Sequence, residues 1–235
     1  MAIEKIDKQT LREKIYAALR EQIILGEILP GQAVTLKDLS ERFDVSIIPV
    51  REALFQLESE GVIVRRTNRD YRVNTLNLRQ FKEIYKIRFI NEIYIARRAF
   101  RNRTHAMERE LEGILEELKG SVGTPKIYVQ KNHDFHFLVY KYGRMPILLE
   151  IINGLWARVG PYLTINAQIE DLGASFQNHQ DMFDALSGED EKRFVSILRK
   201  DIHFSYAILK PFIQGLEKDT EEQIGEILGA GAKGS

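Results

Sequence analysis

The spacing of hydrophobic residues near the start of the chain predicts two short helices. Apolar residues recur every three or four positions over residues 11–24, and the pattern stops at Gly26. A second helical pattern covers residues 35–43, where the hydroxyl of Thr35 is suited to cap the first turn. The chain therefore opens with a helix, a turn and a second helix.

A third helix follows after a very short connection at residues 44–45. We expect it to run from residue 46 to about residue 60, with Ser46 as its N-cap and Gly61 ending it. Its buried stripe is expected to consist of Val50, Ala53, Leu54 and Leu57.

Two short strands are predicted next, over residues 62–66 and 71–74, joined by a tight turn at residues 67–70. Three helices followed by a two-stranded ribbon is the order of a winged helix-turn-helix. In such a unit the third helix enters the major groove of DNA, and the ribbon contacts the neighbouring backbone or minor groove.

The rest of the chain has helical periodicity and no strand pattern, which predicts an all-α bundle of about six helices. The predicted helices cover residues 78–100, 107–118, 127–142, 147–165, 175–186 and 190–215. The fold class is therefore mainly α, with an N-terminal winged helix-turn-helix domain at 1–75, a helical domain at 76–228 and a flexible tail at 229–235.

Length and composition agree with this division. A chain of 235 residues exceeds the usual size of one domain, and 44% hydrophobic with 29% charged residues is typical of a globular protein. The sequence contains no cysteine, no apolar run long enough to cross a membrane and no signal-peptide pattern at its start. We therefore expect a cytoplasmic protein without a membrane partner.

Net charge gives no support to nucleic-acid binding, because 34 basic residues balance 34 acidic ones. The support comes from local placement. Arginine is concentrated in the predicted ribbon, at Arg65, Arg66, Arg69 and Arg72, where a basic edge suits contact with phosphates. Taken alone, the same cluster is equally compatible with a solvated turn.

Three motifs in the N-terminal part carry a family resemblance. They are GEILPGQ at residues 26–32, LKDLS at 36–40, and VSIIPVREAL at 45–54 followed by LESEGV at 57–62. These motifs resemble those of the GntR family of bacterial transcription regulators. The helical remainder resembles the FadR-type subfamily, whose C-terminal domain is called FCD.

The resemblance implies that DNA is contacted by the start of the third helix, by the second helix and by the ribbon. The matching positions are Lys37, Ser46, Ile47, Ile48, Arg51, Arg66 and Arg69. The chain departs from the family where Ile47 and Ile48 replace an Arg and a Thr or Ser, and where Asp70 replaces a Gly. We expect DNA binding with altered specificity, carried by Lys37, Arg51 and the ribbon arginines; a relative that has lost DNA binding is the alternative.

The resemblance also implies a divalent metal site in the bundle. The matching positions are Asn132, His136, His179 and Asp201, where Asn and the final Asp replace the Asp and His usual in the family. Such a set suits Zn²⁺, Ni²⁺, Mn²⁺ or Fe²⁺. Each histidine alone could instead be a packing residue. His203 is expected to face away from the site, and His105 and His133 are expected to be surface or packing residues.

Arg88 and Glu92 match a family pattern in which the arginine faces a ligand cavity, so the resemblance implies that Arg88 binds a small organic acid. An ion pair on the helix surface is the alternative. Further residues expected to line the cavity are Tyr85, Trp156, Arg158, Tyr162 and Asn178.

Together these features predict a DNA-binding transcription regulator, a repressor and not an enzyme, that binds a double-stranded operator as a homodimer and responds to a small organic acid. Two alternatives stay open. One is a metal-dependent hydrolase or lyase using His136, His179 and Asp201, although no general acid or base accompanies this set. The other is a relative that dimerises without binding DNA.

Overall fold

The computed structural model describes residues 10–66, 70–168 and 171–218. The chain forms two compact units, Met1–Thr75 and Leu76–Ser235. Most of the expected ribbon turn, including Arg69, lies outside the described residues, as does the whole of the expected tail at 229–235. No helix in the described part of the chain is long and apolar enough to cross a membrane.

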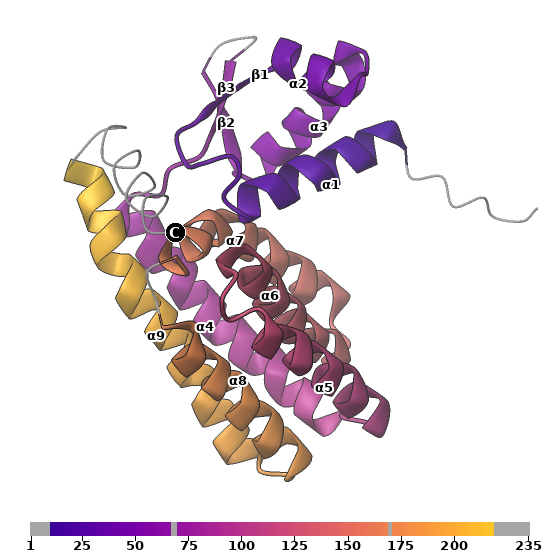
Figure 1. Cartoon of the computed structure of the whole chain (residues 1–235), viewed down its shortest axis with the longest axis vertical. Coiled ribbons are helices and arrows are strands. Elements are labelled where there is room, and N and C mark those ends of the chain that lie inside the picture. Colours follow the sequence, from indigo (N-terminus) through magenta and orange to yellow (C-terminus); the bar gives the residue numbers. More distant parts are fainter. Residues whose placement is uncertain (1–9, 67–69, 169–170, 219–235) are drawn as a thin grey trace, which may run out of the picture. The chain divides into compact units, whose positions relative to one another are not determined.

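The first unit combines helices with a small antiparallel sheet (Figure 1). In chain order its elements are α1 (Leu11–Ile24), β1 (Ala33–Thr35), α2 (Leu36–Phe43), α3 (Ile47–Ser59), β2 (Ile63–Arg65) and β3 (Asp70–Val73). The strand order is β1-β3-β2, with Tyr71 opposite both Val34 and Arg65. This confirms the winged helix-turn-helix. The sequence pattern missed β1, because three residues with a single buried side chain, Val34, are too short to display an alternation.

The core of the first unit lies where α3 packs against α1 and α2. Helix α1 contributes Ile15, Leu19 and Ile23, and the predicted stripe Val50, Ala53, Leu54 and Leu57 of α3 is buried as expected. Burial of each large aliphatic side chain contributes roughly 1.5–3 kcal/mol. This packing fixes the face of α3 that points inward and therefore also the face that is free to meet DNA.

The connections of the helix-turn-helix depend on backbone conformations with positive φ. Asp44 ends α2 at φ 52°, and Gly61, with φ 70°, follows α3. Thr35 caps α2 by accepting a hydrogen bond from the Asp38 N–H at 3.1 Å. Ser46 occupies the N-cap position of α3, but its side chain makes no capping hydrogen bond, so this part of the prediction was wrong.

The second unit is a bundle of helices, as the periodicity predicted. They are α4 (Leu78–Arg101), α5 (His105–Gly120), α6 (Pro125–Tyr142), α7 (Pro146–Asn166), α8 (Leu172–Ser187) and α9 (Glu191–Lys218). Helix α4 runs along the bundle and packs against α6, α7 and α9, while α8 packs against α5 and α9 (Figure 1). Most helices begin earlier than predicted, because a proline opens α6 and α7 and the Thr104 hydroxyl caps α5. This arrangement brings α6, α8 and α9 close enough to share a polar site.

Candidate functional site

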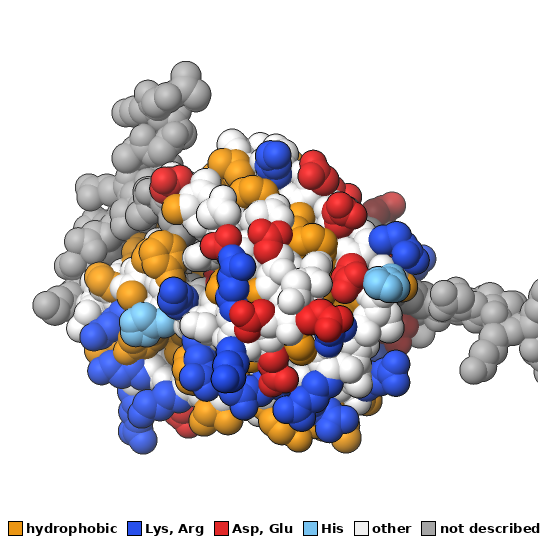
Figure 2. Space-filling model, turned by 90° about the horizontal axis from the view of Figure 1, so that it is seen from below, with side chains coloured by type: hydrophobic (Ala, Val, Ile, Leu, Met, Phe, Trp, Pro, Cys, Tyr) orange, Lys and Arg blue, Asp and Glu red, His pale blue; other side chains and the backbone are white. Residues whose placement is uncertain are grey.

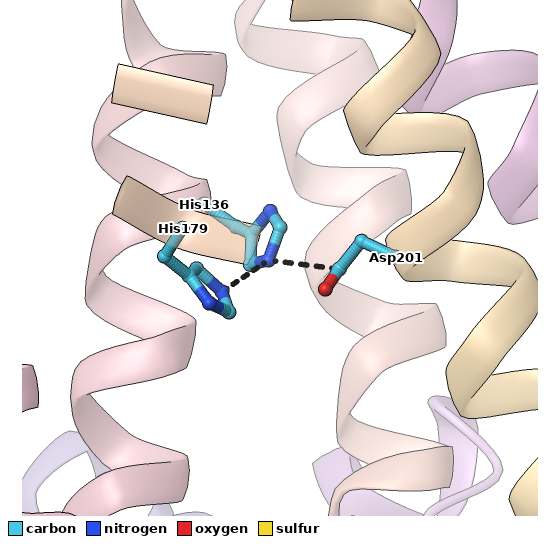
Figure 3. A group of neighbouring side chains, drawn as sticks. All are labelled: His136, His179 and Asp201. Atoms are coloured by element: carbon cyan, nitrogen blue, oxygen red, sulfur yellow. Dashed lines mark hydrogen bonds and ion pairs between the residues drawn. The ribbon is translucent and has the colours of Figure 1, made fainter. Parts of the chain in front are cut away.

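Three side chains from three helices converge inside the bundle. His136 of α6, His179 of α8 and Asp201 of α9 point toward one another (Figure 3). The Nε2 atom of His136 lies 3.2 Å from Nε2 of His179 and 3.3 Å from Oδ2 of Asp201. Both histidines are buried, and the Asp201 side chain is 17% exposed. The sequence separations are large, so only the packing of the helices creates this group.

The hydrogen bonds around the histidines decide which ring nitrogen holds a proton. His179 Nδ1 lies 2.8 Å from the carbonyl oxygen of Ser175, which can only accept, so this nitrogen carries the proton. The Tyr140 hydroxyl donates to Glu92 Oε2 at 2.7 Å and can therefore accept from His136 Nδ1 at 3.4 Å. Both Nε2 atoms then turn a lone pair toward the centre of the group.

A metal ion would satisfy this arrangement more fully than a single proton can. A proton on His136 Nε2 could be directed at His179 or at Asp201, but not along both lines at once. One metal ion would satisfy all three groups, and two ligands held 2.0–2.1 Å from a tetrahedral ion lie about 3.3 Å apart, close to the two distances from His136 Nε2, while all three ligand atoms lie within 4.8 Å of one another. The three residues therefore fit a divalent ion.

The ionisation states also favour a cation. Burial lowers the pKa of the His179 imidazole to about 4, so this ring is neutral at physiological pH. Burial raises the pKa of the Asp201 carboxyl, but when no ion is bound an N–H at His136 Nε2 can donate to it, and together with the nearby charges this outweighs burial, so its pKa is lowered. A neutral imidazole and an ionised carboxylate are the forms that bind metals.

A small cavity of about 50 Å³ adjoins this group, and Asp201 and Asn132 both line it. Since one water molecule needs roughly 10–15 Å³ of such a cavity, the space suits a few water molecules or a very small ligand. The other lining residues are Arg88, Tyr128, Val129, Trp156, Leu163, Asn166, Ala167, Leu172, Ser175, Phe204 and Ser205. Asn132 thus lies beside the same space as Asp201, as the proposed ligand set requires.

Arg88 is the most unusual residue of the cavity, because its guanidinium is only 2% exposed. It lies between the rings of Tyr85 and Trp156, 4.8 and 4.4 Å from their centroids. Its Nε donates to Glu92 Oε1 at 2.7 Å, but its buried Nη1 has no hydrogen-bond partner among the described residues. The Arg88–Glu92 pair is therefore buried, which corrects the alternative of a surface ion pair. A buried donor without a partner is costly and implies an acceptor that the protein itself does not supply.

Glu92 connects the arginine to the histidine group. Its Oε1 accepts from Arg88 and from the indole N–H of Trp156 at 3.0 Å, while Oε2 accepts from Tyr140, which contacts His136. Burial raises the pKa of the Tyr140 phenol well above its usual value, and the Glu92 charge raises it further, so the hydroxyl keeps its proton. The sequence analysis did not find Tyr140, although its position one helical turn after His136 was a usable signal.

Several residues expected at the cavity lie elsewhere. Arg158 and Asn178 do not line it. Arg158 lies two residues after Trp156, and Asn178 lies one residue before His179. At about 100° per residue around a helix, each side chain therefore points away from the cavity. Tyr85 supports one face of Arg88 rather than lining the space, and the Tyr162 hydroxyl accepts from the Leu76 N–H. Of the histidines set aside, His203 and His105 are exposed, and His133 stacks on Phe137 at 4.0 Å.

In the first unit, the residues expected to meet DNA are on the surface. Lys37, Ser46, Ile47, Ile48, Arg51 and Arg66 are all exposed, and Arg69 lies outside the described residues. Lys37 Nζ lies 3.8 Å from Glu41, an exposed pair of little energetic weight. Arg72 is partly buried and donates to the Gly31 carbonyl at 3.1 Å, so one of its N–H groups is already used within the first unit. Sequence analysis also missed Phe55, which is 62% exposed on α3.

Charge elsewhere on the molecule is mixed. On the face shown in Figure 2, Lys and Arg side chains lie among Asp and Glu side chains, in keeping with the net charge of zero. The capacity of the protein to bind DNA therefore rests on the placement of individual residues on α2, α3 and the ribbon.

A winged helix-turn-helix followed by a helical domain with a buried polar cavity defines a class of DNA-binding transcription regulators. Residues 11–73 match the family described as bacterial regulatory proteins, gntR family, and residues 83–204 match the FCD domain. The chain belongs to the GntR family and carries an FCD domain at its C-terminal side.

Named relatives agree with this assignment. The HTH-type transcriptional regulator McbR of Escherichia coli is 30% identical over 210 residues, which cover 87% of this chain and 95% of that protein. The gluconate operon transcriptional repressor of Bacillus licheniformis is 25% identical, covering 82% and 81%. The solved structure of E. coli McbR/YncC superposes with a TM-score of 0.80 at 28% identity, covering 86% of this chain and 98% of that chain. These relatives are named as regulators of transcription.

Proposed function

We propose that this regulator binds operator DNA as a homodimer and that a small carboxylate, held by Arg88 and a divalent ion, controls the binding. The observation that carries the proposal is the buried Nη1 of Arg88, which has no partner among the described residues and belongs to the same cavity as Asp201. An arginine can bind a carboxylate through two parallel hydrogen bonds, and a free carboxylate oxygen can bind a metal ion.

His136, His179 and Asp201 would hold the ion, with Asn132 as an additional oxygen ligand. The ion would be Zn²⁺, Ni²⁺, Mn²⁺ or Fe²⁺, since imidazole and carboxylate ligands suit these metals. When bound, it supplies positive charge and open coordination positions. The protein's own residues bind and orient the ligand. Arg88 would orient the carboxylate, and the rings of Trp156 and Tyr85 hold the guanidinium in position and shield it from water.

The second unit offers a surface for a second copy of the chain. Ile87, Ile90 and Tyr94 are exposed on one face of α4, and α7, which packs beside α4, exposes Ile147 and Ile151. A two-fold dimer buries the same patch on both partners, so each apolar side chain of the patch is removed from water in both protomers. Light scattering should give twice the chain mass for the wild type and for Ile127→Glu, an exposed site on α6, and one chain mass for Ile90→Glu.

Ligand binding is tested by calorimetry on protein loaded with Zn²⁺, using formate, acetate and lactate with their amides as controls. The acids should bind and the amides should not. Arg88→Gln should weaken binding about 10- to 100-fold, since a hydrogen bond to a charged group contributes about 1.5–3 kcal/mol. Arg97→Gln, at an exposed arginine of the same helix, should bind like the wild type. Equal binding of acids by Arg88→Gln would contradict the role of Arg88.

DNA binding itself is tested by fluorescence anisotropy with random and palindromic duplexes over a salt series. Affinity should fall steeply with rising salt, because phosphate contacts release counterions. The absence of any salt-dependent binding would refute the DNA-binding part of the proposal.

A further inference from the structure

The exposed face of α3 carries an apolar surface that the fold does not use. Ile47 is 43% exposed, Ile48 66% and Phe55 62%. Ile48 and Phe55 are seven residues apart and therefore lie on the same side of the helix, with Arg51 and Glu52 between them. The opposite side packs into the core through Val50, Leu54 and Leu57, so rotation of α3 cannot hide these side chains.

Cationic side chains are exposed on α3 itself and on the elements that pack against it. Arg51 is exposed one turn after Ile47 and has no ion-pair partner among the described residues. Lys37 and Arg42 are exposed on α2, which packs against α3, and Arg66 is exposed at the end of β2. An exposed apolar surface on a helix whose neighbours expose cations fits a polyanion that also displays apolar groups. Duplex DNA is such a partner, because phosphates flank a major groove in which thymine presents a methyl group.

The chemistry of isoleucine narrows what can be read at these two positions. An aliphatic side chain neither donates nor accepts a hydrogen bond, so it cannot distinguish the donor and acceptor patterns of base edges. The 5-methyl group of thymine is the apolar feature of the major groove. Residues at the start of the second helix of a helix-turn-helix are the ones that reach base edges, and Ile47 and Ile48 open α3.

We infer that Ile47 and Ile48 select operator sequence by packing against the methyl groups of thymines in each half-site, while Arg51 supplies contacts by hydrogen bonding. This inference rests on the proposed DNA binding and adds its specificity. Ser46 directly precedes Ile47, and its exposed hydroxyl makes no capping hydrogen bond. It would give the start of α3 one polar group for contact with DNA.

The test begins with selection of bound duplexes from a random library by the full-length protein. Thymine should be enriched at one or two positions of each half-site. In a selected duplex, each such thymine is then replaced by uracil, which forms the same base pair and lacks only the methyl group. Each replacement should weaken binding about fourfold, from roughly 0.8 kcal/mol per buried methyl-sized group. Uracil at a thymine outside the half-sites should have no effect and serves as the control duplex.

Protein variants locate the contact. Ile48→Ala should bind the thymine duplex more weakly and should no longer distinguish thymine from uracil at its position, and Ile47→Ala should do the same at the neighbouring position. Leu11→Ala, at a residue 50% exposed on α1, should keep the full discrimination. Circular dichroism of the variants checks that the exposed substitutions leave the fold intact.

The outcomes separate the two proposals. A selected duplex that is bound equally with thymine and with uracil would overturn the methyl readout and leave DNA binding standing. Failure to enrich any sequence, together with no salt-dependent binding, would overturn the proposed function and this inference with it. Unchanged DNA affinity of Ile48→Ala would assign the apolar surface to another partner and would also overturn the inference.

Discussion

The Nε2 atoms of His136 and His179 lie 3.2 Å apart, although each ring directs its other nitrogen to a hydrogen-bond acceptor. Two lone pairs facing one another beside the Asp201 carboxylate form an arrangement that is unfavourable without a cation between them.

Binding of Zn²⁺ should stabilise the protein through these three ligands. At a concentration 100 times the Kd, a ligand that binds only the folded state stabilises it by about 2.7 kcal/mol. This corresponds to a rise in Tm of about 5–10 °C for a domain of this size. Elemental analysis should find one ion per chain. His179→Ala should abolish both effects, while His203→Ala, an exposed histidine on α9, should keep them. Equal metal content in wild type and His179→Ala would rule out this site.

Removal of the Glu92 charge should be strongly destabilising. Glu92→Gln leaves the buried Arg88 guanidinium without a counterion and disturbs the bonds from Trp156 and Tyr140. Breaking one partner of a buried ion pair costs about 3–5 kcal/mol. Urea unfolding should therefore show a large decrease in the midpoint, whereas Glu83→Gln, exposed on the same helix, should change it little. A wild-type midpoint for Glu92→Gln would show that Arg88 does not depend on Glu92.

These two sites show how far sequence reasoning reaches. Periodicity and helix breakers predicted the helices well, because each amphipathic stripe is a local property. The spacing of His136 on its helix and the resemblance to a known family pointed to the metal group. The contacts of Glu92 with Tyr140 and Trp156 span 48 and 64 residues, and no local pattern reports such pairs. The bond from Arg72 to the Gly31 carbonyl was not predicted either, because it joins β3 to the segment before β1, a strand that the sequence pattern missed.

Gly143 should not tolerate a side chain. A Cβ at this position would clash with the Ile95 side chain and would lie 2.8 Å from the Ile95 carbonyl oxygen, which is backbone in the middle of α4 and cannot move aside. Overpacking of this kind costs about 1–3 kcal/mol. Gly143→Ala should therefore lower the free energy of unfolding. Gly113→Ala and Gly154→Ala, where nothing lies within 4 Å, should instead raise it slightly, since alanine favours helix by about 0.8–1 kcal/mol. The three variants together separate the clash from the general effect of replacing glycine.

The link between α1 and α3 should affect the stability of the first unit. The Tyr16 hydroxyl lies 2.7 and 2.9 Å from the two carboxylate oxygens of Glu60, the residue that follows α3. Tyr16→Phe removes this bond to a charged group and should cost about 1–2 kcal/mol, toward the low end of the usual range because the site is half-buried. Denaturant unfolding of the variant should show the loss. Glu21→Gln, at an exposed residue of α1, provides the control.

Arg51 should contribute to DNA binding in a way that Lys37 does not. Arg51 is exposed on α3, whereas Lys37 is exposed on α2, where its pair with Glu41 at 3.8 Å carries little energetic weight. A side chain that reads a base costs about 1–3 kcal/mol when removed and relaxes specificity, while one that contacts only phosphate weakens all sequences alike and lowers the salt slope by about 1. Because α3 is the helix proposed to enter the major groove, Arg51→Ala should relax specificity, and Lys37→Ala should weaken binding to all sequences alike. Anisotropy titrations of both variants against a selected duplex and a scrambled duplex, each at several salt concentrations, measure the difference. Uniform weakening by Arg51→Ala would place this residue on the DNA backbone and leave base readout to the start of α3.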